Sequence, residues 1–145
     1  MQVCANLRRS APLDTRVVAL RRGQEITIPA IEEMLRIKTL LSMERNATRD
    51  FLGVAALSHP LGLTRSAEAL ESLPHRYPPF AGEGGDILST AIVTLTNPSP
   101  FDLAQVDLGG YKGMTPPSTD WRAVEGQCRD LALARLDLPP ESHPA

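Results

Sequence analysis

Apolar and polar positions along the chain predict one short hairpin followed by several helices. Two β-rich runs, residues 17–20 and 25–28, flank a turn that contains Gly23. Pro29 suits the first turn of a helix, and apolar residues surround most positions from there to about Arg45. This helix is therefore expected to be central. Further helices are expected over residues 49–58, 64–73, 87–96 and 118–136.

These elements indicate an α+β fold, with a short β-hairpin followed by a mainly α-helical bundle. Residues 1–29 are predicted to form a partial β segment, residues 30–138 a helical domain and residues 139–145 a disordered tail. A hairpin by itself is marginal in water, so it is expected to need more strands or a helix to lie on. The β segment is therefore interpreted as the last part of an incomplete sheet.

Composition limits the kinds of partner. The chain has 145 residues, a formal net charge of -2 and 4% aromatic residues, which argues against nucleic acid as a partner. No apolar run approaches the roughly 20 residues that a membrane span needs, so no membrane partner is expected. Cys4 and Cys128 have no ligand at metal-binding spacing and are expected to be reduced thiols in a cytoplasmic protein.

Two cations are predicted on the apolar side of the central helix. Lys38 and Arg45 are seven residues apart, which places them within roughly 20° of each other around the helix axis. A cation on a buried face needs an anion, because burial of an unpaired charge costs several kcal/mol. The anion is either internal, with Glu33, Glu44 and Asp50 near in sequence, or a ligand phosphate.

A wider pattern accompanies these cations. In "EMLRIKTLLSMER" and "RDFLG", Glu33, Lys38 and Arg45 are followed by the pair Arg49 and Asp50. This order resembles the E-x4-K-x6-R and Arg/Lys-Asp motifs of the AbiEii/AbiGii toxin family of nucleotidyltransferases. Later segments such as "TNPSPFDL" and "DWRAVEGQCRDLA" look like the helical tail of its longer members, so the resemblance covers residues 16–136.

The resemblance implies a nucleotidyltransferase fold whose intact members use Mg²⁺ and a nucleoside triphosphate. It implies that Lys38 reaches the triphosphate and that Arg45 and Arg49 also belong to the nucleotide-binding site. Asp50 is the implied catalytic residue, either by orienting Lys38 or by acid-base work. Glu33 lies on a different helix face and is expected to be structural.

The chain departs from this family at the metal site. It has no Gly-Ser turn followed by Asp-x-Asp, so no metal ligand is assigned, and Gly53 stands where the family has its second motif Asp. The sequence therefore predicts a truncated or C-terminal portion of a toxin–antitoxin nucleotidyltransferase that is inactive alone. Its hairpin is predicted to be the remnant of the sheet, and its partners to be a nucleotide, an antitoxin protein or the missing N-terminal portion.

The alternative function is a non-catalytic helical interaction module. The last predicted helix carries Trp121 and an apolar face with Val124, Cys128 and Leu131, which would bind a partner such as an antitoxin. In the competing interpretation, the same face packs on the protein's own first helix.

Overall fold

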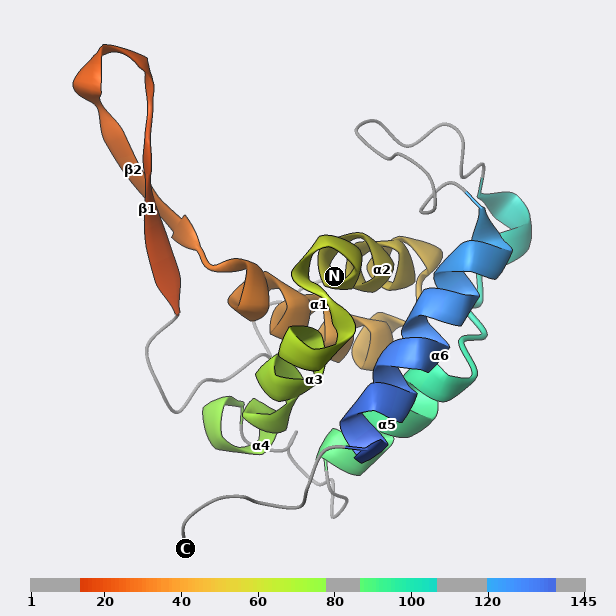
Figure 1. Cartoon of the computed structure of the whole chain (residues 1–145). Helices are drawn as coiled ribbons and strands as arrows, with labels where there is room; N and C mark the ends of the chain where they lie inside the picture. Colours follow the sequence, from red (N-terminus) through yellow and green to blue (C-terminus); the bar gives the residue numbers. More distant parts are fainter. Residues whose placement is uncertain (1–13, 78–86, 107–119, 138–145) are drawn as a thin grey trace, which may run out of the picture.

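The computed structural model describes residues 14–77, 87–106 and 120–137 (Figure 1). Within them an antiparallel hairpin, β1 (Thr15–Ala19) and β2 (Glu25–Pro29), precedes a body of helices, which confirms the predicted α+β fold. The α-helices are α1 (Ile31–Arg45), α2 (Thr48–Leu61), α3 (Leu63–Glu71), α4 (Leu73–Arg76), α5 (Ile87–Thr96) and α6 (Trp121–Asp137). The predicted tail, residues 139–145, and Cys4 lie outside the described residues.

The hairpin forms where the sequence predicts it and stands away from the helical body (Figure 1). Its strands pair from Thr15 opposite Pro29 to Ala19 opposite Glu25. The connecting turn contains a short 3-10 segment, Arg21–Gly23, and is closed by a hydrogen bond from the Leu20 N–H to the Gln24 carbonyl at 2.6 Å. No further strand occurs in the described ranges, so the sheet there has two strands.

Helices α1 and α2 form a corner at the centre of the body. Helix α1 ends because Asn46 adopts a left-handed conformation, with φ 53°, and its N–H bonds back to the Ser42 carbonyl at 3.1 Å. The chain then turns at once into α2. Phe51, Leu52 and Val54 in the first half of α2 are fully buried, since this helix lies between α1 and α6.

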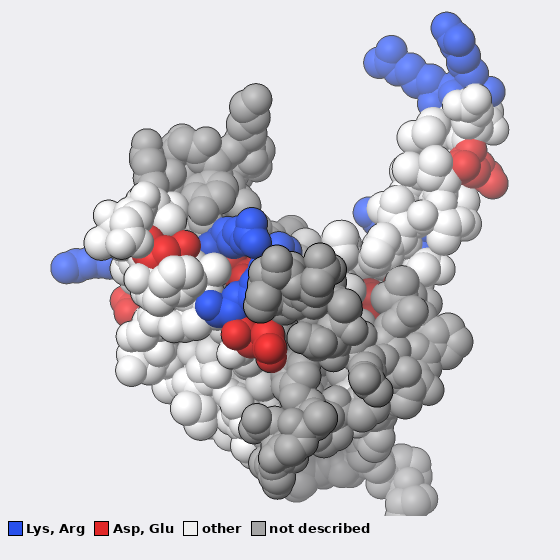
Figure 2. Space-filling view, turned by 180° about the vertical axis from the view of Figure 1, so that it is seen from behind, with Lys and Arg blue, Asp and Glu red and all other residues white. Residues whose placement is uncertain are grey.

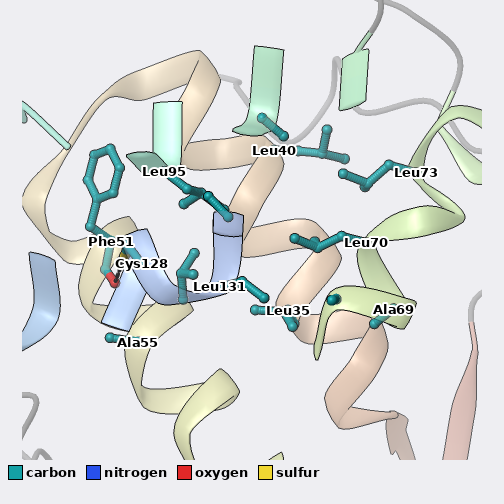
Figure 3. Packing of buried hydrophobic residues seen from close by; sticks show 14 of the residues in the cluster. Leu35, Leu40, Phe51, Ala55, Ala69, Leu70, Leu73, Leu95, Cys128 and Leu131 are labelled. Atoms are coloured by element: carbon teal, nitrogen blue, oxygen red, sulfur yellow. Dashed lines mark hydrogen bonds between the residues drawn. The ribbon is translucent and has the colours of Figure 1, made fainter. Parts of the chain in front are cut away.

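The remaining helices close the core around this corner. Helix α6 packs on α2, α3 and α5, and buries one face along its length. Figure 3 shows side chains from several helices converging on one apolar cluster. Its labelled members are Leu35, Leu40, Phe51, Ala55, Ala69, Leu70, Leu73, Leu95, Cys128 and Leu131.

Several predicted boundaries differ from the observed ones. Pro29 closes β2 rather than opening the helix, and α1 begins at Ile31. Helix α2 was expected to stop at residue 58 but continues through Pro60, because the Gly62 N–H caps the Ser58 carbonyl at 2.9 Å. Gly62 has a φ of 91°, a conformation that glycine adopts without strain.

Candidate functional site

Asp50 is the centre of the predicted site. It lies in the first turn of α2 and its side chain is fully buried. Arg45, at the end of α1, donates to both carboxylate oxygens, from Nε to Oδ2 at 3.0 Å and from Nη2 to Oδ1 at 2.6 Å. Lys38 Nζ approaches the same Oδ1 at 3.6 Å. The structure thus brings together three of the four predicted site residues.

This geometry makes Asp50 an internal counter-ion. Two cations from α1 balance one buried carboxylate from α2, and the paired hydrogen bonds to Arg45 hold that carboxylate in a fixed orientation. The side chains of Lys38 and Arg45 are 37% and 21% exposed, so both reach solvent while pairing inward. Of the two anions considered for these cations, the internal one is present. The contacts therefore lock the α1–α2 corner.

Gly53 lies beneath the Lys38 side chain. A Cβ atom at position 53 would stand 2.9 Å from Lys38 Cδ and 3.0 Å from Cγ, closer than real Cβ atoms come without something shifting. The absence of a side chain therefore lets the lysine stem cross α2 and reach Asp50. This contact gives Gly53 a packing role, where the sequence resemblance treated it as a missing carboxylate.

Arg49 is placed differently from the other three residues. It is exposed on the outer side of the first turn of α2, and no ion pair between its side chain and a described carboxylate is found. Its positive charge lies near Asp102 and is one of the smaller influences that lower the pKa of that carboxyl group. Arg49 therefore does not join the Lys38–Arg45–Asp50 cluster.

Asp102 is a residue that sequence reasoning missed. Its Oδ1 accepts hydrogen bonds from the Thr48 N–H at 2.8 Å and the Thr48 hydroxyl at 2.7 Å. The bond from the Thr48 N–H is the main cause of a lowered pKa for Asp102, because it stabilises the carboxylate. Asp102 thus caps the start of α2 from a segment far along the chain. No local spacing signals this contact.

A second buried ionic cluster surrounds Glu33. Its Oε1 accepts from Arg36 Nη1 at 2.9 Å, and its Oε2 accepts from the Tyr77 hydroxyl. Arg36 Nε also donates to the Ala69 carbonyl at 2.8 Å, which ties α1 to α3. The Asp14 N–H reaches Glu33 at 3.3 Å and joins the base of the hairpin to this cluster. These contacts match the structural role expected of Glu33.

The face of α6 that was considered for partner binding is internal. Val124, Cys128 and Leu131 are fully buried, against α2, α3 and α5 rather than mainly against the first helix. Trp121 is half-buried and stands edge-on to Phe51, with ring centroids 6.3 Å apart and an interplanar angle of 88°. Because the core covers this face, it is not free to bind an antitoxin as the alternative prediction required.

The described ranges contain neither a candidate metal site nor a candidate membrane span. No group of three or more His, Cys, Asp or Glu side chains in residues 14–77, 87–106 and 120–137 is arranged to hold a metal ion. In the same residues, no helix combines the length and the apolar character that crossing a membrane demands.

The fold and its clusters define a helical domain, carrying a hairpin arm, whose buried charges pair internally. No protein-family model and no solved structure matches the chain. Curated relatives match nearly all of it. The chain is 30% identical over 131 residues, 90% of its length, to the heme uptake protein MmpL11 of Mycobacterium tuberculosis. It is 29% identical over 133 residues to the mycolic acid-containing lipids exporter MmpL11 of Mycolicibacterium smegmatis.

The match covers a small part of each relative. It spans 13% of the M. tuberculosis protein and 14% of the M. smegmatis protein. A probable transport protein MmpL11 of Mycobacterium leprae is 26% identical over 132 residues, 13% of its length. The similarity therefore concerns a segment of these transport proteins.

These relatives overturn the predicted family. They are named as transport, uptake and export proteins, so the assignment to the AbiEii/AbiGii toxin nucleotidyltransferases is wrong. The predicted truncated toxin–antitoxin enzyme and the antitoxin-binding alternative are wrong with it. The spacing of Lys38, Arg45 and Asp50 is not specific to that family. It meets a general requirement, because a buried carboxylate at a helix corner needs cations to neutralise it. With the resemblance removed, no described contact tests a nucleotide-binding or catalytic role for them.

Proposed function

We propose that this chain serves an MmpL11-type transport system as a water-facing helical domain. The main support for this proposal is that 90% of the chain matches one segment of the M. tuberculosis heme uptake protein at 30% identity. Uptake and export both mean passage across a membrane. In this proposal the domain does not line the path of the cargo. It is a folded part that stands beside the membrane-embedded portion.

The distribution of apolar and charged residues supports a water-facing domain. Helix α6 directs Val124, Cys128 and Leu131 into the core, while Arg129 and Asp130 are exposed on its outer side. A helix in contact with lipid would need apolar side chains on its outer side, because charged side chains in hydrocarbon are costly. The Arg45–Asp50 charge pair holds α1 to α2. In the Glu33 cluster, the hydrogen bond from Arg36 to the Ala69 carbonyl ties α1 to α3.

We place the domain on the cytoplasmic side of the membrane. Three arginines, Arg16, Arg21 and Arg22, lie on the hairpin arm, and regions rich in Lys and Arg near membranes favour the cytoplasmic face. A reporter that works on one side of the membrane only, fused to the matching segment of the M. tuberculosis relative, tests this placement. A fluorescent reporter at the domain is expected to be active and a phosphatase reporter inactive. The reverse result would contradict the cytoplasmic placement.

Segment exchange in the M. smegmatis relative tests the proposed function. The matching segment of that protein is deleted and then replaced by this chain, and export of mycolic acid-containing lipids is measured. We expect deletion to reduce export and the chimera to restore it. An unrelated helical domain of similar size is the control and is expected to restore nothing. If the chimera is present in the membrane at normal amounts and export stays low, the proposal fails.

A further inference from the structure

The hairpin arm is the part of the fold that the helical core does not explain. It projects from the body (Figure 1). Most residues of its two strands are exposed. Opposed residues share a face of a hairpin, so Val18 and its partner Ile26 lie on one face together with Ile28. Ile26 is 45% exposed although it is apolar. A two-stranded sheet is marginal alone, so this arm has reason to rest on another surface.

Charge is separated between the arm and the body. Residues 15–29 contain three arginines and one glutamate, a net charge of +2, although the whole chain carries -2. The other residues therefore carry a net charge of -4. Figure 2 shows Lys and Arg side chains gathered at the free end of the arm. The arm is therefore a positively charged part of a chain that is negative as a whole, which favours an anionic partner for the arm.

The two arginines of the turn are presented together. Arg21 and Arg22 are exposed, and no described carboxylate forms an ion pair with either. Arg22 has a φ of 68°, a left-handed conformation that costs a non-glycine residue roughly 1 kcal/mol. Asn or Gly would hold the same turn with less strain, so the arginine is not needed for the turn itself. Beside them Leu20 is 42% exposed.

We propose that the tip of the arm, residues 20–24, docks on the anionic phospholipid surface of the membrane. Unpaired arginines bind phosphate groups through several N–H donors, and the adjacent leucine can enter the boundary between headgroups and acyl chains. The choice of a lipid surface rests on the proposed function, which places the domain beside a membrane. The absence of a spanning run does not bear on it, since surface docking needs no span.

Vesicle binding by the full chain tests this docking. The probes are vesicles of phosphatidylcholine alone and vesicles that also contain phosphatidylglycerol, and bound protein is measured by sedimentation. We expect binding to the anionic vesicles only, with release at about 0.5 M NaCl because salt screens exposed charges. Arg21→Gln combined with Arg22→Asn is expected to weaken binding about 30-fold, since each basic residue near such a surface contributes about a factor of five. Asn at position 22 tolerates the left-handed turn.

Two control variants distinguish the effect of where the positive charges lie from the effect of the total net charge. Arg49→Gln with Arg122→Gln makes the same change in net charge on the exposed surface of the body and is expected to leave binding within about twofold. Arg21→Lys with Arg22→Lys keeps the charge and is expected to keep binding. Unchanged helical circular dichroism in every variant shows that the body remains folded.

Several outcomes overturn the inference. Equal binding to neutral vesicles, or equal loss in the Arg49 and Arg122 control, excludes arginine-directed lipid docking. Displacement by inorganic phosphate at low concentration would assign a site for free phosphate. Binding to RNA that depends on Arg21 and Arg22, without vesicle binding, would assign a nucleic acid. If vesicle binding is absent while the exchanged segment still restores export, the docking fails and the proposed function stands.

Discussion

The aliphatic part of Lys38 lies directly over Gly53, where α1 crosses α2. A Cβ atom at position 53 would meet three consecutive carbons of the lysine stem, Cγ, Cδ and Cε, at 2.9 to 3.1 Å. The ammonium beyond them reaches Asp50 at 3.6 Å. Gly53 on α2 leaves the space that the long Lys38 side chain on α1 occupies. The effect of a substitution at one of these positions on stability should therefore depend on the residue at the other.

Gly53→Ala is expected to have different effects on stability in two backgrounds. In a Lys38→Ala variant the added methyl has room, and alanine in a helix interior is favoured over glycine by about 1 kcal/mol. In the parent chain the methyl displaces the lysine stem and weakens its contact with Asp50, so the gain should vanish or reverse. Urea unfolding of the four proteins gives the coupling between positions 38 and 53, expected to be about 1 kcal/mol or more.

Gly126 provides the matched control for this cycle. It lies inside α6, and apart from its chain neighbours and the adjacent backbone of that helix, a Cβ there would meet nothing within 4 Å. Gly126→Ala is expected to stabilise the chain by about 1 kcal/mol whether position 38 is Lys or Ala. Equal effects of Gly53→Ala in both backgrounds would contradict the proposed contact.

Asp50→Asn is expected to destabilise the chain by about 3 kcal/mol. The substitution keeps the shape of the side chain but leaves Arg45 and Lys38 without their buried anion. Lys38→Met should cost less, about 0 to 1 kcal/mol, because the Lys38 side chain is 37% exposed and solvent screens its charge. Urea unfolding measures both.

Glu44→Gln is the control for the Asp50 substitution. Glu44 is exposed in the last turn of α1, and its replacement is expected to change the free energy of unfolding by less than about 0.5 kcal/mol. A loss below about 1 kcal/mol in Asp50→Asn would show that the cluster does not lock the corner.

The sequence predicted the elements better than the contacts between them. The hairpin and α1 have clear local patterns, and α5 has the predicted bounds of 87 to 96. The pairing of Lys38 and Arg45 with a nearby carboxylate was among the options, because all three residues lie within thirteen positions of the chain. Local periodicity is what a single sequence displays most directly.

Long-range partners left no such signal. Tyr77 reaches Glu33 across 44 positions, and Asp102 reaches Thr48 across 54. Neither distance corresponds to a helical or strand repeat, so only the folded chain reveals these pairs. The family prediction failed for a related reason. Spacing alone cannot distinguish cations that neutralise an internal carboxylate from cations that await a ligand.

The cap on Thr48 should make stability depend on pH. The pKa of Asp102 is lowered from 3.8 in the folded chain, first by its bond from the Thr48 N–H. The unfolded chain therefore binds more protons near this pH, so the contribution of Asp102 is complete above its unfolded pKa and is lost as the pH falls through the folded pKa. Asp102→Ala is expected to cost about 1 to 2 kcal/mol at pH 7 and less near pH 3.

Asp102→Asn is the comparison variant for this cap. An asparagine oxygen can still accept from Thr48 but carries no charge, so its cost at pH 7 should be smaller than that of alanine. Urea unfolding at both pH values measures these differences. An Asp102→Ala cost that is the same at pH 3 and pH 7 would contradict the charged cap.

The Cys128 thiol should react very slowly with thiol reagents while the helical body is folded. Burial raises the pKa of its thiol to about 12, with a smaller contribution from the negative charge of Glu125. Relative to the ordinary value of 9.0, the thiolate fraction at neutral pH falls on the order of 1,000-fold, and the thiolate is the reactive species. In a Cys4→Ser variant, where only Cys128 can react, a thiol reagent should label the native chain at least about 100-fold more slowly than the urea-unfolded chain. Rapid labelling of the native chain would mean that α6 opens readily from α2 and α5, and the internal face described for Val124 and Leu131 would then be accessible.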